Sequence, residues 1–292
     1  NPLLSLADKS VYSIPMLLMI GWRGEPGIKD EPQHIKQGEV TEQILKTLSI
    51  PYIIIDSKTN YKKELGDLIQ LMKEQSRPVA ILVKKDTFKS YSPPSKAQQE
   101  FEISREDAIK IIVDETNENT LMISTTGMAS RELYEYRKFK NLSHENDFLT
   151  VGSMGHSSLI ALGISMQNNK KDIICIDGDG SMIMHMGNLG LIGQNKCKNF
   201  THIILNNGAH DSVGGQPTLG LKMDLPKIAL ACGYENVVSV NNKKQFKEAI
   251  KMRQNYSLIE IKVNKGNRKD IGRPDTSPLE NKDNFMNNIL KK

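Results

Sequence analysis

Residues 171–218 read KDIICIDGDGSMIMHMGNLGLIGQNKCKNFTHIILNNGAHDSVGGQPT, and the fold class can be predicted from this segment. It contains two apolar runs of strand length, IICI at 173–176 and HIIL at 202–205, and each ends abruptly in polar, glycine-rich sequence. Such runs are typical of parallel strands that are covered on both faces, and ligands lie beyond the carboxyl ends of such strands. The sequence therefore predicts an α/β fold with two ligand loops at one sheet edge, GDGS at 178–181 and NNG at 206–208.

The side chains of these two loops suit a hard cation. Asp179 offers carboxylate oxygens, and Asn206 and Asn207 offer amide oxygens, which are donors that Mg²⁺ accepts while it shares phosphate oxygens. Gly178 and Gly180 leave room for a ligand to approach the backbone. Ser181 begins a helical stretch whose first N–H groups would face an anion. The two loops together predict a Mg²⁺ ion that bridges the protein and a diphosphate.

Two other kinds of site share parts of this pattern. A calcium loop of the EF-hand type that began at Asp177 would need Gly and Glu where the chain has Met182 and Asn188, which argues against calcium. The DGDG at 177–180 also resembles the first motif of haloacid-dehalogenase-type phosphatases. That motif lies in mid-chain here, and no downstream acidic pair follows at a strand end. A phosphatase stays an alternative with weaker support.

The spacing between GDG at 178–180 and NN at 206–207 resembles the thiamine-diphosphate signature. Over essentially the whole chain, the sequence resembles the phosphonopyruvate decarboxylases, a family of thiamine-diphosphate-dependent enzymes. Four phrases carry this resemblance: GWRGEPGIKDEPQH at 21–34, STTGMASREL at 124–133, GDGSMIMHMG at 178–187 and NNGAHDSVGGQPT at 206–218. It implies two doubly wound parallel-sheet domains, a partial pyrimidine-binding domain and a diphosphate-binding domain.

The resemblance also implies roles for particular residues. Asp179 and Asn207 would ligate Mg²⁺ through their side chains, and Ala209 would do so through its carbonyl oxygen. His34 and His210 would lie at the reaction centre, where a histidine orients the substrate or relays a proton. The implied cofactor-binding residues are Thr126, Gly127, Ser153, Met154, Gly178, Asp179, Gly180, Ser181, Asn207 and Ala209.

The implied reaction is the thiamine-diphosphate- and Mg²⁺-dependent decarboxylation of 3-phosphonopyruvate, an anionic 2-oxo acid, to phosphonoacetaldehyde and CO₂ in phosphonate biosynthesis. The cofactor takes up the electrons that the departing CO₂ leaves behind. A sulfopyruvate decarboxylase would share the fold and the cofactor and stays open. Sites of this family lie between subunits, so the resemblance also implies a homo-oligomer that is at least a dimer.

The remaining sequence alternates strand-like and helical stretches in two parts. Residues 1–88 have predicted strands at 16–20, 52–55 and 79–83, with helices near 39–48 and 61–74. Residues 89–103 have the composition of a linker, and SRED at 104–107 predicts the first helix of a second domain, 104–265. Residues 266–292 form a basic tail, which is either solvated or a lid that brings Arg268 or Arg273 to an anion.

The first residues indicate a longer protein. Asn1 stands where an initiator Met is expected, and residues 3–6 read like the middle of a helix. In the family that the chain resembles, a glutamate of the pyrimidine domain activates the cofactor, and its segment would precede Asn1. No residue is assigned to that role. A cofactor-binding fragment or subunit without activity of its own is therefore a further alternative.

Composition excludes several functional classes. The chain of 292 residues is 38% hydrophobic and 25% charged, and its net charge of +5 comes without clusters of basic and aromatic residues. These values argue against a nucleic-acid partner. The longest apolar run near the start, at 15–20, is too short to span a bilayer, so no membrane segment is expected. Three cysteines, with Cys175 in a predicted core strand, indicate reduced thiols and a cytoplasmic protein.

Overall fold

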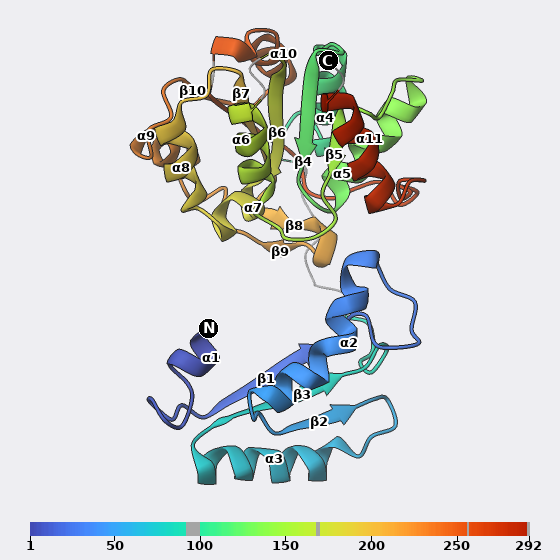
Figure 1. The fold of residues 1–292 in the computed structure, drawn as a ribbon, viewed down its shortest axis with the longest axis vertical. Coiled ribbons are helices and arrows are strands. Elements are labelled where there is room, and N and C mark those ends of the chain that lie inside the picture. The colour runs from blue at the N-terminus through green and yellow to red at the C-terminus, as the bar shows by residue number, and fades with distance from the viewer. Residues whose placement is uncertain (92–99, 168–169, 256, 291–292) are drawn as a thin grey trace. The chain divides into compact units, whose positions relative to one another are not determined.

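The computed structural model describes residues 1–91, 100–167, 170–255 and 257–290, and the chain divides into two compact units, Asn1–Pro94 and Ser95–Lys292 (Figure 1). Each unit is built around a parallel sheet. The predicted α/β fold class is confirmed. The predicted boundaries 1–88, 89–103, 104–265 and 266–292 stay a prediction, because residues 92–99 of the linker lie outside the described residues.

The first unit has a three-stranded sheet in the order β1-β3-β2. The three predicted strands correspond to β1 (Met16–Gly21), β2 (Tyr52–Ile55) and β3 (Pro78–Val83). The helix α3 (Tyr61–Gln75) packs Leu68 on one side of β3, and α2 (Pro32–Thr47) packs Leu45 against Ala80 on the other. A one-turn helix, α1 (Pro2–Ser5), adds Leu3 to the second cluster.

The second unit has a six-stranded sheet in which every pair of neighbours is parallel, in the order β10-β11-β7-β6-β4-β5. Its four inner strands are buried, nearly continuous apolar runs, as parallel sheets that are covered on both faces require. The strands are β4 (Thr120–Ser124), β5 (Asp147–Leu149), β6 (Asp172–Gly178), β7 (Phe200–Asn206), β10 (Val237–Val240) and β11 (Leu258–Lys262).

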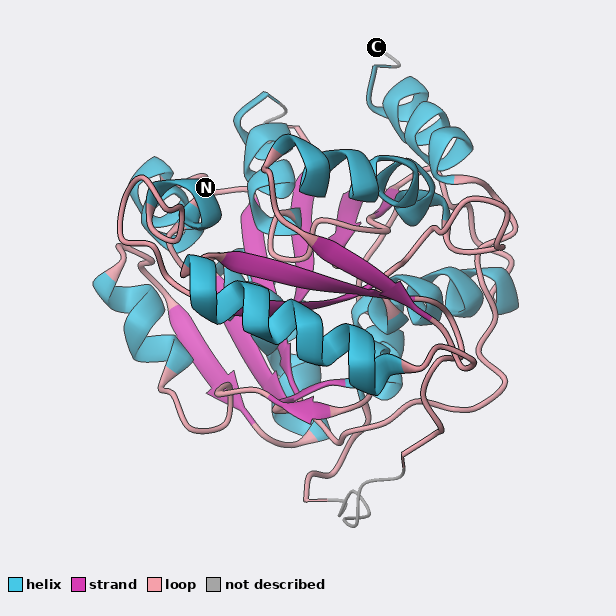
Figure 2. Cartoon of the chain, turned by 90° about the horizontal axis from the view of Figure 1, so that it is seen from below, coloured by secondary structure: helices cyan, strands magenta, loops and turns pink. Residues whose placement is uncertain are grey.

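Helices cover both faces of this sheet and alternate with its strands along the chain (Figure 2). One hydrophobic cluster joins the sheet to α4 (Arg105–Asp114), α5 (Met128–Phe139) and α10 (Lys243–Lys251). The cluster on the other face contains α6 (Ser157–Gln167), α7 (Asp179–Met184), α8 (Asn188–Asn195), α9 (Leu225–Ala231) and α11 (Pro278–Leu290). Ser104 and Asp107 form a capping box at the start of α4, where SRED predicted a helix.

The order of the strands places a topological switch point between β4 and β6. From β4 the chain moves outward to β5 and then returns to place β6 on the opposite side of β4. At such a point the loops after the two neighbouring strands run in opposite directions and leave a crevice between them, where ligands of open α/β sheets bind. The loop that starts at Thr125 and the GDGS loop therefore lie on the two sides of the place where a ligand is expected.

The C-terminal segment differs from the predicted tail. Residues 278–290 form α11, whose Phe285 is 1% exposed and packs against Phe148 of β5 at a ring-centroid distance of 5.5 Å. Before this helix, Arg268 forms ion pairs with Glu106 and Glu135. Sequence patterning did not indicate α11, because its few apolar residues lie among many Asn, Lys and Asp residues.

Candidate active site at the carboxyl edge of the second sheet

Asp179 is the one carboxylate in the sequence of the two predicted loops, GDGS and NNG. It follows β6 as the first residue of α7 and is 1% exposed. Its carboxyl group accepts hydrogen bonds from the Thr218 hydroxyl and from the backbone amides of Asn207 and Gly180. Burial raises the pKa of Asp179, and these hydrogen bonds oppose the increase. The side chain is thus held in place while its negative charge is poorly solvated.

The asparagine pair meets Asp179 from the end of β7. The Asn206 amide is fully buried and donates from Nδ2 to Glu260 Oε1 at 2.7 Å and to the carbonyl of Gly220 at 2.9 Å. Asn207 accepts the Ala209 N–H on its Oδ1 at 3.0 Å. The structure therefore brings Asp179, Asn206 and Asn207 together, as adjacent parallel strands require.

The loop after β4 joins the same site. The Thr125 hydroxyl lies 3.1 Å from the Ser181 hydroxyl, which directly connects the two loops of the switch point. Gly127 has a φ of +90° and precedes α5, and a Cβ added to it would lie 2.2 Å from Ser212 Oγ. Ser212 Oγ also accepts the N–H of Met128 at 3.3 Å. Thr126 and Gly127 are thus placed beside the loop that follows the asparagine pair.

His210 and the loop 152–156 complete the surroundings of α7. A Cβ on Gly180 would lie 2.8 Å from His210 Nδ1, so the imidazole lies directly on this glycine. A Cβ on Gly155 would lie 2.9 Å from the Ser181 carbonyl, which places the loop of Ser153 and Met154 against the end of the same helix. Gly178, Gly180, Ser181, Ala209 and His210 are therefore neighbours, and Ser153 and Met154 adjoin them.

His34 lies in the first unit, in the first turn of α2. Its Nδ1 is 3.0 Å from Asp30 Oδ1, and the same carboxylate binds Arg23. The Arg23 guanidinium is the main reason that the pKa of Asp30 is lowered. A Cβ on Gly24 would lie 1.9 Å from the His34 carbonyl, so the loop 21–26 packs tightly on the start of α2. The residues of the resembling phrase 21–34 thus form one cluster.

The donor set at Asp179 fits a divalent cation. No residue in the described part of the chain forms an ion pair with Asp179, although the side chain is 1% exposed. Buried carboxylates are normally paired with a cation or bound to a metal, because an isolated charge in the interior is costly. The neighbouring oxygens are amide, hydroxyl and carbonyl oxygens, which suit Mg²⁺ rather than Zn²⁺. Asp179, Asn207 Oδ1 and the carbonyl of Ala209 are the residues available to hold it.

Sequence reasoning missed several residues of this site. Thr218 lies in the phrase NNGAHDSVGGQPT, but nothing in the sequence connects it to Asp179. Gly220 follows that phrase, and its own sequence context carries no signal. Glu260 did leave a signal, because it is a charged residue inside the apolar strand LIEIK and is 2% exposed.

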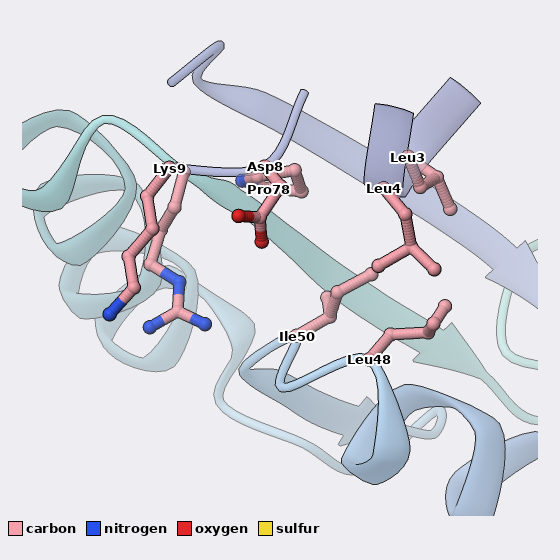
Figure 3. Close-up of a pocket in the computed structure, with 8 residues that line it drawn as sticks. Leu3, Leu4, Asp8, Lys9, Leu48, Ile50 and Pro78 are labelled. Carbon is pink, nitrogen blue, oxygen red and sulfur yellow. The ribbon is translucent and has the colours of Figure 1, made fainter. Parts of the chain in front are cut away.

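Two cavities elsewhere contain none of the predicted site residues. One, of about 10 Å³ and thus no larger than a water molecule, lies in the first unit beside Leu4, Leu48 and Ile50 (Figure 3). The other, of about 200 Å³, is lined by residues such as Phe200, Asn236 and Ser257 at the amino ends of β7, β10 and β11. Neither cavity competes with the carboxyl edge as the reaction centre.

Cys175, Asp177 and His202 also form a buried group of potential metal ligands inside the second sheet. His202 lies 3.3 Å from Asp177 through Nε2 and 3.1 Å from the Tyr234 hydroxyl through Nδ1. Hydrogen bonds therefore account for both ring nitrogens. All three cysteines are free thiols, and no described helix has the length and apolar character that a membrane span needs.

Comparison with known proteins agrees with this geometry. Residues 125–261 match the model of the thiamine pyrophosphate enzyme, C-terminal TPP binding domain. The chain is 29% identical to a phosphonopyruvate decarboxylase of Streptomyces viridochromogenes, and the match covers 96% of this chain and 73% of that protein. It is 30% identical to a sulfopyruvate decarboxylase of Methanosarcina acetivorans, over 87% of this chain and 70% of the relative.

A third relative is the sulfopyruvate decarboxylase subunit beta of Methanococcus maripaludis, which is 35% identical over 65% of this chain and 100% of its own length. The matched domain model contains the loops after β4, β6 and β7, so the similarity extends over the site described above. The chain therefore belongs to the family of thiamine-pyrophosphate-dependent decarboxylases, carboxy-lyases that include the phosphonopyruvate and sulfopyruvate decarboxylases.

Proposed function

We propose that this chain is a Mg²⁺- and thiamine-diphosphate-dependent decarboxylase of 3-phosphonopyruvate, which yields phosphonoacetaldehyde and CO₂ in phosphonate biosynthesis. The observation that carries the proposal is Asp179, a buried carboxylate without an ion pair in the described structure, beside Asn207 at the switch point of a parallel sheet. The similarity to phosphonopyruvate decarboxylases over 96% of the chain supports the choice of substrate.

In this proposal the loops of the second unit anchor the cofactor. Asp179, Asn207 and the Ala209 carbonyl hold Mg²⁺, and the metal holds the diphosphate group. Thr126, Gly127 and Ser181 contact the diphosphate, and Ser153 and Met154 support the rest of the cofactor. Bound thiamine diphosphate supplies the electron sink for decarboxylation. The role of the metal is to anchor the cofactor rather than to activate the substrate.

Two histidines are assigned to the substrate. His210 is half-buried against Gly180, close to the proposed metal ligands, and it orients the 2-oxo acid or relays a proton. His34 has the Asp30 carboxylate on its Nδ1, and such a contact fixes the orientation of an imidazole and leaves Nε2 for the substrate. The glutamate that activates the cofactor in the family is assigned to no residue.

Calorimetry tests the cofactor site. Thiamine diphosphate should bind the wild-type chain in a Mg²⁺-dependent manner, and Asp179→Ala should abolish this binding because it removes the proposed charged ligand. Asp283→Ala, which changes an exposed carboxylate on α11, should bind normally. Binding that is independent of Mg²⁺, or that survives in Asp179→Ala, would contradict the proposal. Mg²⁺-dependent phosphate release without thiamine diphosphate would instead support a phosphatase.

Sulfopyruvate is the second candidate substrate, because the relatives with 30% and 35% identity are named sulfopyruvate decarboxylases. A competition experiment distinguishes the two substrates. CO₂ should be released faster from phosphonopyruvate, and sulfopyruvate should be the weaker competitor. The reverse order would favour sulfopyruvate as the substrate. Cofactor binding without CO₂ release from either substrate would favour a cofactor-binding subunit, for which the relatives named subunit beta are a precedent.

We also propose a cytoplasmic homo-oligomer that is at least a dimer. Three free thiols support a reducing compartment. Large apolar side chains on α7 and on the loops around the site support association, since Val151, Met184, Val213 and Leu219 are between 37% and 69% exposed.

A further inference from the structure

We propose that Asp211, held by Arg105, which Glu132 holds in turn, is a positioning residue that turns the amide of Asn207 so that its carbonyl oxygen, and not its NH₂ group, is presented to the metal. This inference rests on the proposed function, because it assigns a partner to one of the proposed Mg²⁺ ligands. It concerns three charged residues from three separate elements that the proposed chemistry does not use directly.

The contacts converge on one carboxylate oxygen. Asp211 Oδ2 accepts a hydrogen bond from Asn207 Nδ2 at 2.7 Å, from Arg105 Nη1 at 2.7 Å and from the backbone N–H of Gly266 at 2.9 Å. The Asp211 side chain is 8% exposed. The carboxylate is thus fixed by groups from α4 and from the segment after β11. Its hydrogen bond to Nδ2 in turn fixes the orientation of the Asn207 amide.

Arg105 is itself held on its other side. Its Nε and Nη2 donate to the two carboxylate oxygens of Glu132 at 2.8 Å each, in the parallel arrangement that suits a guanidinium. The side chains of Arg105 and Glu132 are 8% and 1% exposed. Because α4 and α5 supply these two residues, the position of Asp211 is determined by the two helices on one face of the sheet.

The chemistry of the amide explains why an acidic neighbour matters. The two ends of an asparagine amide have nearly the same shape, but only the oxygen can ligate a metal, and only the NH₂ group can donate. An ionised carboxylate only accepts hydrogen bonds, so Asp211 selects the NH₂ end of Asn207. The oxygen Oδ1 is then turned away from Asp211 and accepts the N–H of Ala209 at 3.0 Å, next to the proposed carbonyl ligand.

The neighbouring residue connects this cluster to the diphosphate loop. Ser212 Oγ accepts the N–H of Met128 at the start of α5 and packs against Gly127. The short segment 211–212 therefore touches both Asn207 and the loop that is proposed to bind the diphosphate. The same loop therefore contacts a proposed metal ligand and the loop that is proposed to bind the diphosphate.

Stability alone does not account for the cluster. Desolvation of buried charges consumes most of the energy that their attraction returns, so a buried ion pair is weak evidence for stabilisation. Here two carboxylates share one guanidinium, which leaves a negative excess beside the side chain of Asn207. The excess negative charge is unfavourable when no cation is bound and favourable beside a divalent cation. A cluster that supports metal binding is expected to have this property.

Asp211→Asn provides the test, with Asp147→Asn as the matched control. Asp147 pairs with Arg137 at 2.6 Å and is fully buried, but it belongs to the edge strand β5, which carries none of the proposed ligands. Calorimetry with thiamine diphosphate in the presence of Mg²⁺ gives the affinity of each full-length variant. The loss of a partner that orients a metal ligand should raise the Kd of Asp211→Asn about 10- to 100-fold.

A second readout does not need the cofactor. Hydrogen exchange of the Asn207 side-chain amide in the cofactor-free protein, followed by nitrogen-15 NMR and assigned with Asn207→Ala, should be slow in the wild type and fast in Asp211→Asn. Asp147→Asn should retain both the wild-type affinity and slow exchange. Arg105→Lys, which keeps the charge but loses the fork that binds both carboxylates, should show an intermediate loss of affinity.

An unchanged Kd in Asp211→Asn, or an equal loss in Asp147→Asn, would overturn the inference. Fast exchange in the wild type would overturn the positioning contact while leaving the proposed function intact, provided that Mg²⁺-dependent binding is seen. A wild-type chain that shows slow exchange but no Mg²⁺-dependent binding would instead overturn the proposed function and, with it, the metal-directed role of Asp211.

Discussion

Gly220 is the residue that most directly limits the space around the Asp179 carboxylate. A Cβ at this position would lie 2.2 Å from Asp179 Oδ2 and 2.7 Å from Asn206 Oδ1. Both neighbours are buried and hydrogen-bonded, so neither can move without losing partners. We expect Gly220→Ala to displace the Asp179 carboxylate and to weaken Mg²⁺-dependent binding of thiamine diphosphate by at least about tenfold in calorimetry.

Gly163→Ala is the control for this prediction. Gly163 is an exposed residue of α6, and a Cβ there would have no atom within 4 Å. Alanine in an exposed helix position should raise the free energy of unfolding by about 0.5 to 1 kcal/mol and leave the affinity unchanged. Equal affinities in the two variants would show that Gly220 does not shape the site.

At the scale of elements, α11 is a structural part of the second unit. Phe285 is 1% exposed, and Asn281 of the same helix donates to the Asp147 carbonyl and accepts the Leu149 N–H. We expect Phe285→Ala to lower the free energy of unfolding of this unit by about 3 to 5 kcal/mol, because it removes a large buried side chain. Urea denaturation followed by circular dichroism measures the change.

Leu279→Ala tests whether this effect comes from burial. Leu279 lies on the same helix and is 63% exposed, so its truncation should change the free energy of unfolding by no more than about 0.5 kcal/mol. If Phe285→Ala also has only a small effect, residues 278–290 contribute little to the stability of the unit. That result would agree with the prediction from the sequence that these residues form a tail.

At the scale of the whole molecule, the apolar side chains around the carboxyl edge lead us to expect association. Val213 is 69% exposed and Leu219 is 55% exposed, and both lie in the loop that carries the proposed ligands. Analytical ultracentrifugation should give a mass of at least twice the 32.8 kDa of the chain. Val213→Asp, which places a charge on this surface, should shift the distribution towards the monomer.

A substitution on α11, which carries none of the proposed ligands, is the control for association. Lys282→Ala on α11 changes a half-exposed side chain and should leave the sedimentation profile as in the wild type. A chain that sediments as a monomer at all protein concentrations, with or without thiamine diphosphate and Mg²⁺, would contradict the expected assembly.

The sequence by itself determined the strands that carry the site and the loops that follow them. Parallel strands covered on both faces appear as short continuous apolar runs, so the central residues of β6 and β7 were predicted, and β1, β2 and β3 were predicted nearly to the residue. Loops at strand ends carry the polar chemistry, and their residue types identified Asp179 and Asn207 as partners. The short strand β5 and the helices α8 and α9 left no comparable signal, because few residues define their pattern.

The residues that surround those loops are determined by tertiary packing. Arg105 and Asp211 are 106 positions apart, and Asn206 and Glu260 are 54 positions apart. Such pairs depend on the order and register of the strands and on how α4 and α5 lie on the sheet, and local sequence does not encode them. Gly220 is a further case, because its importance comes from the approach of its backbone to two buried side chains. The sequence thus specified the groups that are proposed to bind a metal, and packing specified the groups that hold them in place.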